Sequence, residues 1–322
     1  METAAFRPLD PADMQAVCQL INEGNAHDGL LMVMDVEELR EELSPPALEP
    51  ATDTRGAFVN DTVVGVAWTQ YLPSEVTQER CYVFGNVHPD HRGHGIGQEL
   101  MEWGTNRADA LLKSGTNALP KFIRTQALDG VTDAHRLMAR FGLTPVRYFD
   151  ELVIALTDLA PAPTIDGVSI VAWPAERSDE IQAVKNASFA SHWGSTPASD
   201  AVWRQTTQGF GARTDLSFVA VDRNNTIVAM LLTYRYEADD TVLGYAQGYI
   251  DKVGTLAKWR GRGIASALIL TALHRYREVG LTHAALDVDS DSPTGANRLY
   301  ATIGFVPHTR SITFERSVTL TG

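Results

Sequence analysis

One stretch of this sequence occurs twice in the same order, and this repetition limits how the chain can fold. The first copy contains Arg-Gly-His-Gly-Ile-Gly at residues 92–97, and the second contains Arg-Gly-Arg-Gly-Ile-Ala at residues 260–265. Each is followed by a second match, HRLMARFGLTPV at 135–146 and NRLYATIGFVPH at 297–308. The offsets, 260 − 92 = 168 and 299 − 137 = 162 residues, are nearly equal. Two matches in one order predict two copies of one domain in series.

A proline-containing segment separates the two copies. Residues 158–167, DLAPAPTIDG, include Pro161 and Pro163 and show no apolar periodicity. Because proline fixes φ and removes a backbone donor, this composition is typical of a semi-extended linker. We therefore predict an N-terminal domain over residues 1–157, a linker over 158–167 and a C-terminal domain over 168–322.

Each copy is predicted to form a mixed α/β domain, with a mostly antiparallel twisted sheet flanked by helices. After a first amphipathic helix, strand pairs meet at Asn60-Asp61 and at Asn224-Asn225, and asparagine tolerates the positive φ of hairpin turns. A further strand then enters the glycine-rich turn, and an amphipathic helix follows it. Gly115 and Gly280 stand where a left-handed residue would end that helix.

Charge and composition exclude several classes of protein. The chain has 27 basic and 40 acidic residues, a net charge of −13, which disfavours binding to nucleic acid or to anionic membranes. No apolar run approaches the roughly 20 residues that span a bilayer, and the N-terminal residues lack a secretory signal pattern. Cys18 and Cys81 are interpreted as small buried hydrophobic residues in a reducing cytoplasm.

The glycine-rich turn has the chemistry of an anion-binding site. The first amides of a helix have no intrahelical partner, and Gly261 and Gly263 have no Cβ to keep a ligand from the main chain. Several convergent N–H donors with an arginine can hold a pyrophosphate. Neither turn has the Lys-Ser/Thr ending of a mononucleotide P-loop or the third glycine of a dinucleotide-binding turn.

The motifs of both halves resemble those of the GCN5-related N-acetyltransferase (GNAT) family. Residues 87–97 resemble the family pattern V-x-P-x-x-R-G-x-G-I-G, and residues 299–305 resemble its L-Y-x-x-x-G-F. The second copy departs at Ala257, where proline is usual, and Ser292 stands where asparagine is common. The resemblance covers nearly the whole chain, twice, as in two-domain members of the family.

This resemblance implies the residues that bind acetyl-CoA. In the family, the [QR]xxGx[GA] turn binds the pyrophosphate, and splayed central strands leave amides free for the thioester oxygen and the pantetheine. In the first copy the implied residues are Val87, Arg92, Gly93, His94, Gly95, Ile96, Gly97 and Gln98. In the second copy they are Val253, Thr255, Arg260, Gly261, Arg262, Gly263, Ile264, Ala265, Ser266 and Asn297.

The resemblance also implies which copy performs chemistry. Acetyl transfer to an amine needs a base for the amine, stabilisation of the oxyanion and an acid for the departing thiolate. A tyrosine of the second motif often supplies that acid in the family, and here it is Tyr300, whose phenol stays protonated at neutral pH. Met138 stands at the matching place in the first copy. We therefore expect a catalytically degenerate N-terminal domain.

The base and the acceptor site leave alternatives open. Asp251 shares a strand face with residues just before the turn and is the first candidate for the base, although it could instead form an ion pair with a neighbouring Lys or Arg. Glu237 is the second candidate. His192, Trp193 and Trp203 fall where the family binds its acceptor, yet they could equally pack the core. The histidines lack paired metal-ligand spacing, so no metal is expected.

The sequence therefore predicts a cytoplasmic N-acetyltransferase that moves an acetyl group from acetyl-CoA to a primary amine. Transfer is expected to be direct, in a ternary complex, with the active site in the C-terminal domain. A small cationic amine suits the acidic chain, and amino sugars, polyamines, amino acids, a cysteinyl glycoside and protein N-termini stay open. Alternatives are a CoA-binding sensor without catalysis and an acyltransferase with a carrier-protein or aminoacyl-tRNA donor. A monomer or weak homodimer is expected.

Overall fold

The chain divides into two compact units, each described here by itself. The computed structural model describes residues 3–45, 48–292 and 295–319. Unit 1 consists of residues Met1–Tyr148 and Arg310–Gly322, and unit 2 consists of Phe149–Thr309. Among the described residues, no helix is both long enough and apolar enough to cross a bilayer.

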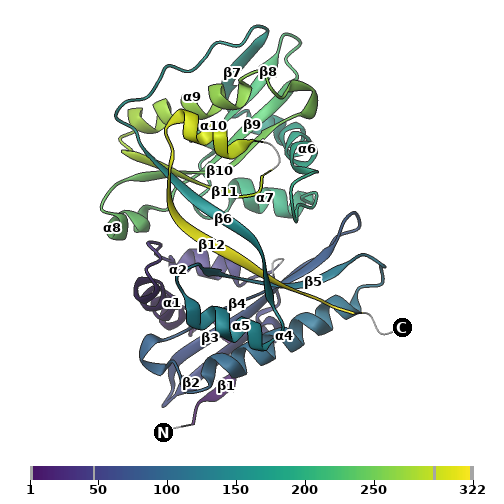
Figure 1. Ribbon diagram of the computed structural model, residues 1–322, viewed down its shortest axis with the longest axis vertical. Coiled ribbons are helices and arrows are strands. Elements are labelled where there is room, and N and C mark those ends of the chain that lie inside the picture. The colour runs from purple at the N-terminus through teal and green to yellow at the C-terminus, as the bar shows by residue number, and fades with distance from the viewer. Residues whose placement is uncertain (1–2, 46–47, 293–294, 320–322) are drawn as a thin grey trace. The chain divides into compact units, whose positions relative to one another are not determined.

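The sheet of unit 1 has the strand order β1-β2-β3-β4-β5-β12 (Figure 1). β4 and β5 run parallel, and the other neighbours are antiparallel. The strands are β1 (Ala5–Arg7), β2 (Thr54–Val59), β3 (Thr62–Leu72), β4 (Glu79–Val87), β5 (Lys121–Leu128) and β12 (Val306–Ser317). The helices are α1 (Met14–Asp28), α2 (Val36–Glu42), α3 (Pro50–Asp53), α4 (Ile96–Ser114) and α5 (Thr132–Arg140).

The sheet of unit 2 repeats this plan in the order β7-β8-β9-β10-β11-β6, with β10 and β11 parallel. Its strands are β6 (Thr144–Ala155), β7 (Val168–Ala172), β8 (Phe218–Asp222), β9 (Ile227–Tyr234), β10 (Gln247–Thr255) and β11 (His283–Asp289). Its helices are α6 (Ser178–Phe189), α7 (Asp200–Gln208), α8 (Asp240–Leu243), α9 (Ile264–Glu278) and α10 (Ala296–Ile303). The predicted fold class, a mixed and mostly antiparallel sheet flanked by helices in each of two copies, is confirmed.

The last strand of each sequence copy, β6 in the first and β12 in the second, does not belong to the unit that the linker position predicts. We call β6 and β12 the closing strands. Residues 311–317 of β12 pair with β5 in unit 1, and residues 149–155 of β6 pair with β11 in unit 2. The units therefore differ from the predicted domains 1–157 and 168–322, because the last strand of each sequence copy completes the sheet started by the other. The segment 158–167 lacks a helix, and its Leu159 and Ile165 pack on the core of unit 2.

Alternating side chains of the central strands bury both faces of each sheet. On β3, Val66 and Trp68 pack in the core under α1 and α2, whereas Ala67 packs in the core under α4. On β9, Met230 packs in the core with α6 and α7, and Leu231 packs in the core with α9. Helices therefore cover both faces, as α1 and α4 do in unit 1 (Figure 1).

The predicted turns are confirmed, with one exception. Asn60, Asp61 and Asn225 have positive φ values of 49°, 60° and 62°, and Gly280 has a φ of 91°. Gly115, in contrast, has an extended backbone with a φ of −69°, so the prediction of a left-handed residue there was wrong. A Cβ at Gly115 would lie 2.7 Å from Glu79 Oε2 and 2.8 Å from Lys121 Nζ. This glycine is needed for space rather than for its backbone angles.

Alanine at position 115 is expected to destabilise unit 1 by about 1–3 kcal/mol, because its Cβ would displace the charged ends of the buried ion pair of Glu79 and Lys121. The measurement is chemical denaturation, with hydrogen exchange to locate the loss on β4 and β5. Gly130→Ala is the control, since a Cβ there meets nothing within 4 Å. Equal stability of the two variants would contradict this explanation.

Candidate functional site

The two parallel strands of unit 2 separate soon after they begin to pair. Gln247–Tyr249 of β10 pair with His283–Ala285 of β11, and beyond Tyr249 the strand stays paired with β9 alone. The Leu256 amide donates to Val228 O of β9 at 3.0 Å. Because backbone groups alternate along a strand, the amides of Val253 and Thr255 point the other way, towards the side of β11. The two residues implied for thioester and pantetheine binding thus present N–H donors there.

Unit 1 has the same separation between β4 and β5. Glu79–Tyr82 pair with Lys121–Arg124, and the pairing then ends. The His88 amide donates to Val64 O of β3 at 3.0 Å, so the amide of Val87 points towards the side of β5 by the same alternation. Both copies therefore keep the backbone geometry that the acetyl-CoA prediction requires.

Each glycine-rich turn leads directly into a helix N-terminus. Gly263 has a φ of 81° and is the N-cap of α9, without a side-chain cap, and Gly95 with a φ of 89° occupies the same place before α4. Ile264 is 1% exposed, so it can reach a ligand only through its amide. The amides of Ile264, Ala265 and Ser266 form the first turn of α9 and can serve an anion.

The two turns differ at their third helical residue. The amide of Gln98 in α4 donates to Gly95 O at 3.0 Å, which removes one donor from the turn of unit 1. His94, next to it, is exposed. Gly97 corresponds to Ala265, and a Cβ at Gly97 would make only ordinary contacts with Leu137 and Val87 at 3.5 and 3.7 Å. The exchange of glycine for alanine between the copies is therefore sterically neutral.

The arginine at the start of each turn bonds to protein carbonyls or carboxylates. Arg260 Nε donates to Thr255 O at 3.1 Å, and its Nη2 donates to Ser188 O of α6 at 2.8 Å. Arg92 Nε donates to Val87 O at 3.0 Å, and its two Nη groups donate to the Asp28 carboxylate at 2.5 and 3.0 Å. Each arginine thus ties the end of its strand to the first helix of its copy. These bonds compete with the predicted contact to a pyrophosphate.

Arg262 is better placed to meet an anion beside the turn. It is exposed, and its guanidinium lies over the Trp259 ring, 4.7 Å from the centroid. Its Nη2 makes a long bond of 3.4 Å to Lys258 O. The weak bond leaves this cation able to turn towards a bound phosphate.

Tyr300 lies on α10, where it packs against the core of unit 2 with its ring 5.8 Å from that of Phe305. Desolvation raises the pKa of its phenol to about 12, so the group carries its proton at neutral pH. Asn297, one turn earlier, donates from its side-chain amide to Asp289 O at 3.2 Å and to Ser290 O at 3.1 Å. In this structure Asn297 holds the turn that follows β11.

The two carboxylates considered as the base have different surroundings. Asp251 lies at an irregularity in the pairing of β10 with β9, between Ile250 and Lys252. It is ion-paired with Lys252, which is the alternative that the sequence left open. Glu237 lies on a short 3-10 segment, η4 (Glu237–Asp239), where it is exposed, and its charge acts on Arg213. The exposed position of Glu237 therefore leaves Asp251 as the better candidate for the general base.

The structure adds two carboxylates that sequence reasoning missed. Asp287 on β11 lies directly opposite Glu151 on β6, and Asp287 hydrogen-bonds the Tyr249 hydroxyl. Desolvation raises the pKa of Asp287, and the nearby Asp251 charge raises it further. Desolvation likewise raises the pKa of Glu151, although the Thr309 hydroxyl donates to it at 2.9 Å. We refer to Asp251, Asp287 and Glu151 around Tyr249 as the carboxyl cluster.

Only one signal in the sequence could have suggested this cluster. Asp287 interrupts the apolar centre of the strand HAALDVD, but its partner on β6 is more than one hundred residues away in sequence. The pairing of β6 with β11 depends on the exchange of closing strands, which the repeat pattern does not specify. Glu151 could therefore be recognised only from the sheet register.

Unit 1 provides an internal comparison, because the pairing of β4 with β5 and of β5 with β12 matches that of β10 with β11 and of β11 with β6, although the irregularity at Asp251 has no counterpart between β3 and β4. The positions that carry titratable groups in unit 2 carry apolar side chains, a hydroxyl or a buried thiol in unit 1. The matching pairs are Tyr249 with Cys81, Asp251 with Val83, Asp287 with Thr125, Glu151 with Phe314 and Tyr300 with Met138. Burial raises the pKa of the Cys81 thiol to about 12. Carboxyl and phenol groups are thus present at these positions only in unit 2.

The residues predicted to bind the acceptor occupy two kinds of position. Trp203 is 3% exposed, lies 6.2 Å from the Trp173 ring and donates from Nε1 to Ser178 Oγ at 2.9 Å. This indicates a core role rather than contact with an acceptor. His192 and Trp193 lie between α6 and α7, and desolvation and then the Arg260 charge lower the pKa of His192. His192 therefore lies near the glycine-rich turn of unit 2.

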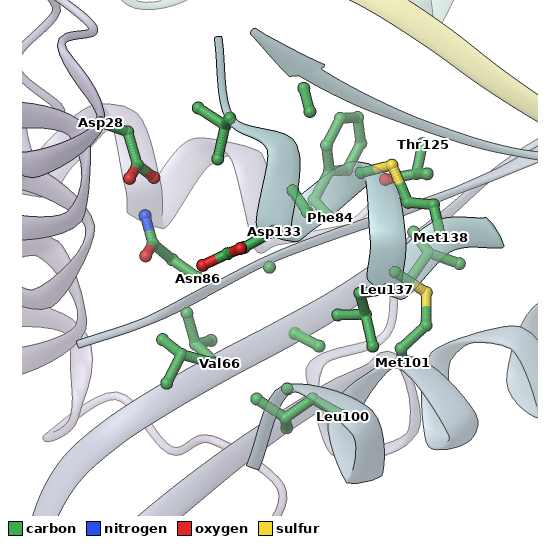
Figure 2. Close-up of a pocket in the computed structure, with 18 of the residues that line it drawn as sticks. Asp28, Val66, Phe84, Asn86, Leu100, Met101, Thr125, Asp133, Leu137 and Met138 are labelled. Carbon is green, nitrogen blue, oxygen red and sulfur yellow. The ribbon is translucent and has the colours of Figure 1, made fainter. Parts of the chain in front are cut away.

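Unit 1 contains a cavity of about 870 Å³ beside its own glycine-rich turn. Figure 2 shows Asp28 and Asn86 at one end, and Phe84, Met101 and Met138 at the other. Residues from α1, β3, β4, α4, β5 and α5 line it. A cavity of this volume lies in the range of small-molecule sites.

Comparison with known proteins identifies the family. The model of the acetyltransferase (GNAT) family matches residues 29–142 and again residues 179–305. This chain belongs to the GNAT family and contains its domain twice. Mycothiol acetyltransferase of Tsukamurella paurometabola is 30% identical to it over 242 residues, covering 72% of this chain and 76% of that protein. Mycothiol acetyltransferase of a Parafrankia species is 26% identical and covers 97% of both chains.

Solved structures agree with the tandem arrangement. The GCN5-related N-acetyltransferase of Sphaerobacter thermophilus has a TM-score of 0.76 and 26% identity, with 98% of this chain and 96% of that chain covered. A tandem GNAT protein of the clavulanic acid biosynthesis pathway has a TM-score of 0.73 at 17% identity, with 99% and 100% covered. The second likeness concerns the fold alone.

Substitution of Arg92 by Gln is expected to destabilise unit 1 by about 1–2 kcal/mol, because it breaks a two-pronged, partly buried ion pair with Asp28. Chemical denaturation and hydrogen exchange at the end of β4 measure the loss. Arg136→Gln is the control, since the ion pair of Arg136 with Asp133 is 69% and 76% exposed and such pairs contribute little. A loss in Arg92→Gln no larger than in Arg136→Gln would show that Arg92 is not a structural tie.

Proposed function

We propose that the protein is an acetyl-CoA-dependent N-acetyltransferase that acts on a small cationic primary amine in unit 2. Membership of the GNAT family and the relatives named mycothiol acetyltransferase support acetyl transfer to a small acceptor. The contrast between the two copies is the observation that carries the proposal. Only unit 2 combines the open strand edge and glycine-rich turn with Tyr300 and the carboxyl cluster, and unit 1 is catalytically degenerate.

The residues of unit 2 suit acetyl-CoA, which supplies the thioester carbon that the amine attacks. The first-turn amides of α9 and the guanidinium of Arg262 would hold the pyrophosphate. The amides of Val253 and Thr255 would bind the thioester oxygen and the pantetheine. Thr255 Oγ1 is buried and has no hydrogen-bond partner among the described residues, so a bound ligand could satisfy it.

The side chains of unit 2 then divide the proton transfers. The carboxyl cluster attracts the ammonium form of the acceptor, and Asp251 accepts one of its protons, directly or through water. The amine lone pair forms the C–N bond, and a backbone amide such as that of Val253 stabilises the oxyanion. When the C–S bond breaks, the sulfur takes the proton of Tyr300. After the C–N bond forms, the nitrogen loses its second proton, and this proton restores the phenol through solvent. The proton that Asp251 accepted is then the one released for each amide formed.

Tyr300→Phe is expected to lower kcat by about 10²–10³-fold, because the thiolate then leaves without an acid. The affinity for acetyl-CoA should be unchanged, since the phenyl ring keeps the packing on Phe305. A thiol-release assay with a panel of amines measures kcat, and Met138→Leu in unit 1 is the matched control.

Three outcomes would contradict the assignment of the active site. Unchanged turnover in Tyr300→Phe would remove Tyr300 as the acid. Higher turnover in Met138→Tyr would show that unit 1 is a working site that lacks only its acid. Binding of acetyl-CoA by the native protein without thiol release for any amine would favour a sensor.

The pH profile of kcat/KM is expected to fall as the pH decreases through the pKa values of Asp287 and Glu151, because their protonation removes the negative charge that attracts the ammonium form of the acceptor. Desolvation raises the pKa of Asp287 and that of Glu151 above the ordinary range. The fall in kcat/KM should therefore begin at a higher pH than for a solvated carboxylate. Asp251→Asn should lower the plateau and displace this limb, while Glu237→Gln should leave it in place. The reverse result would transfer the role to Glu237.

A further inference from the structure

The segment between β6 and β7 lies along helix α9. His274 Nε2, towards the C-terminal end of α9, donates to Ala160 O at 2.9 Å. At the other end of the helix, a Cβ at Gly263 would lie 3.3 Å from Ile165 Cδ1, so the Ile165 side chain packs on the glycine-rich turn itself. Residues 158–167 therefore run antiparallel to α9, from its C-terminal half to its first turn.

The burial of this segment repeats at every third residue. Leu159, Ala162 and Ile165 are half-buried and pack against the core of unit 2, whereas the residues between them are exposed. A polyproline II helix has three residues per turn, and Pro161 and Pro163 fix the φ angles that this conformation needs. The three apolar side chains therefore share one face of the segment.

The two contacts with α9 agree in their spacing. Ala160 and Ile165 are five residues apart, which is about 16 Å at the rise of a polyproline II helix. Gly263 and His274 are eleven residues apart, which is about 16 Å at the rise of an α-helix. Ile165 thus reaches the glycine-rich turn because the segment is extended along the helix.

A tight turn fixes Ile165 at the end of this segment. The Val168 amide donates to Ile165 O at 3.1 Å, and Gly167 has a φ of 72°. β7 then begins at Val168 and pairs with β8. Asp166 forms an ion pair with Arg223, but both side chains are largely exposed, and such pairs contribute little. Backbone hydrogen bonds therefore determine where the Ile165 side chain lies.

The first sequence copy lacks this contact at its own turn. A Cβ at Gly95 would meet no atom of the described residues within 4 Å, whereas a Cβ at Gly263 would meet Ile165. The turns are otherwise alike, since the Ala267 amide donates to Gly263 O at 3.0 Å and the Glu99 amide donates to Gly95 O at 3.1 Å. The contact therefore belongs to the copy that also has the carboxyl cluster.

The contact acts on the part of the chain whose amides an anion needs. Gly263 has no side chain and a φ of 81°, so the residue itself restricts the turn little. Several amides must point to one place before they can hold a phosphate. When only a fraction of the molecules has that arrangement, the apparent Kd rises in proportion. A side chain that packs on the turn from outside therefore increases the affinity without touching the ligand.

We propose that residues 158–167 form a strap on α9 and that Ile165 is a positioning residue, which holds the glycine-rich turn of unit 2 in the arrangement that receives the pyrophosphate of acetyl-CoA. This inference rests on the function proposed above for unit 2. It gives the segment between the two copies a role in ligand binding as well as in connecting them.

Hydrogen exchange of the full chain tests this role, with coenzyme A as the ligand. The Ala267 amide closes the first turn of α9, so its exchange reports on that turn, and its protection at increasing concentrations of coenzyme A gives the Kd at unit 2. In Ile165→Ala, the Ala267 amide of the free protein should exchange several-fold faster, and the Kd should rise about three- to tenfold. The Glu99 amide of unit 1 should keep its native exchange rate.

Further variants separate this role from a general loss of packing. Leu159→Ala removes a side chain from the same strap and the same core, but at the His274 end, so it should keep the native Kd and the native exchange of Ala267. Ile165→Leu keeps terminal methyl groups at the turn and should restore the native Kd. If Ile165→Ala fails to fold, Ile165→Val replaces it, because it lacks only the Cδ1 methyl, and the Kd should then rise about two- to threefold.

Two results would overturn the role of the strap alone. These are an unchanged Kd in Ile165→Ala, and equal increases of the Kd in Ile165→Ala and Leu159→Ala. Both leave the proposed acetyl transfer standing, because the native protein still binds coenzyme A. If coenzyme A fails to protect Ala267 in the native protein, the function proposed for unit 2 is rejected, and the role of Ile165 is rejected with it.

Discussion

The structure of both units depends on two parallel strands that stop pairing after a few residues. Where β10 leaves β11, and where β4 leaves β5, backbone donors that a continuous sheet would consume are left facing the other strand. An amide without a backbone partner must bond to water or to a ligand, so this edge can receive one. The glycine-rich turn lies at the end of the same strand and adds the free amides of a helix N-terminus.

The arginine at each turn shows how that geometry is kept. Sequence reasoning gave Arg92 and Arg260 to the ligand, but both guanidinium groups bond to the carbonyl at the end of their strand and to the first helix of their copy. The helix group that accepts the bond differs, since it is a carboxylate in unit 1 and a backbone carbonyl in unit 2. In both units, however, the arginine connects the end of the strand to the first helix. Arginine therefore repeats in the motif for a structural reason as well as an electrostatic one.

Local sequence patterns predicted the helices, strands and turns. The features that they did not predict depend on pairing between residues far apart in the sequence. The hairpins at Asn60-Asp61 and Asn225, the glycine-rich turns and the following helices all follow from signals within a few residues. The exchange of β6 and β12 does not, since both copies have equivalent closing strands and either sheet edge satisfies their backbone groups. Gly115 was misread for a similar reason, because the ion pair that excludes a Cβ there joins β4 to β5.

The candidate site was predictable in its backbone and less so in its side chains. The motif located the turn and Tyr300, but it could not place Glu151 opposite Asp287 or assign Trp203 to the core. Like charges at directly opposed strand positions destabilise a sheet, and the matching positions of unit 1, Thr125 and Phe314, avoid that cost. Unit 1 shows that the fold forms without the opposed carboxylates. A pair that the fold does not need and that opposes folding supports the proposal that unit 2 performs the chemistry.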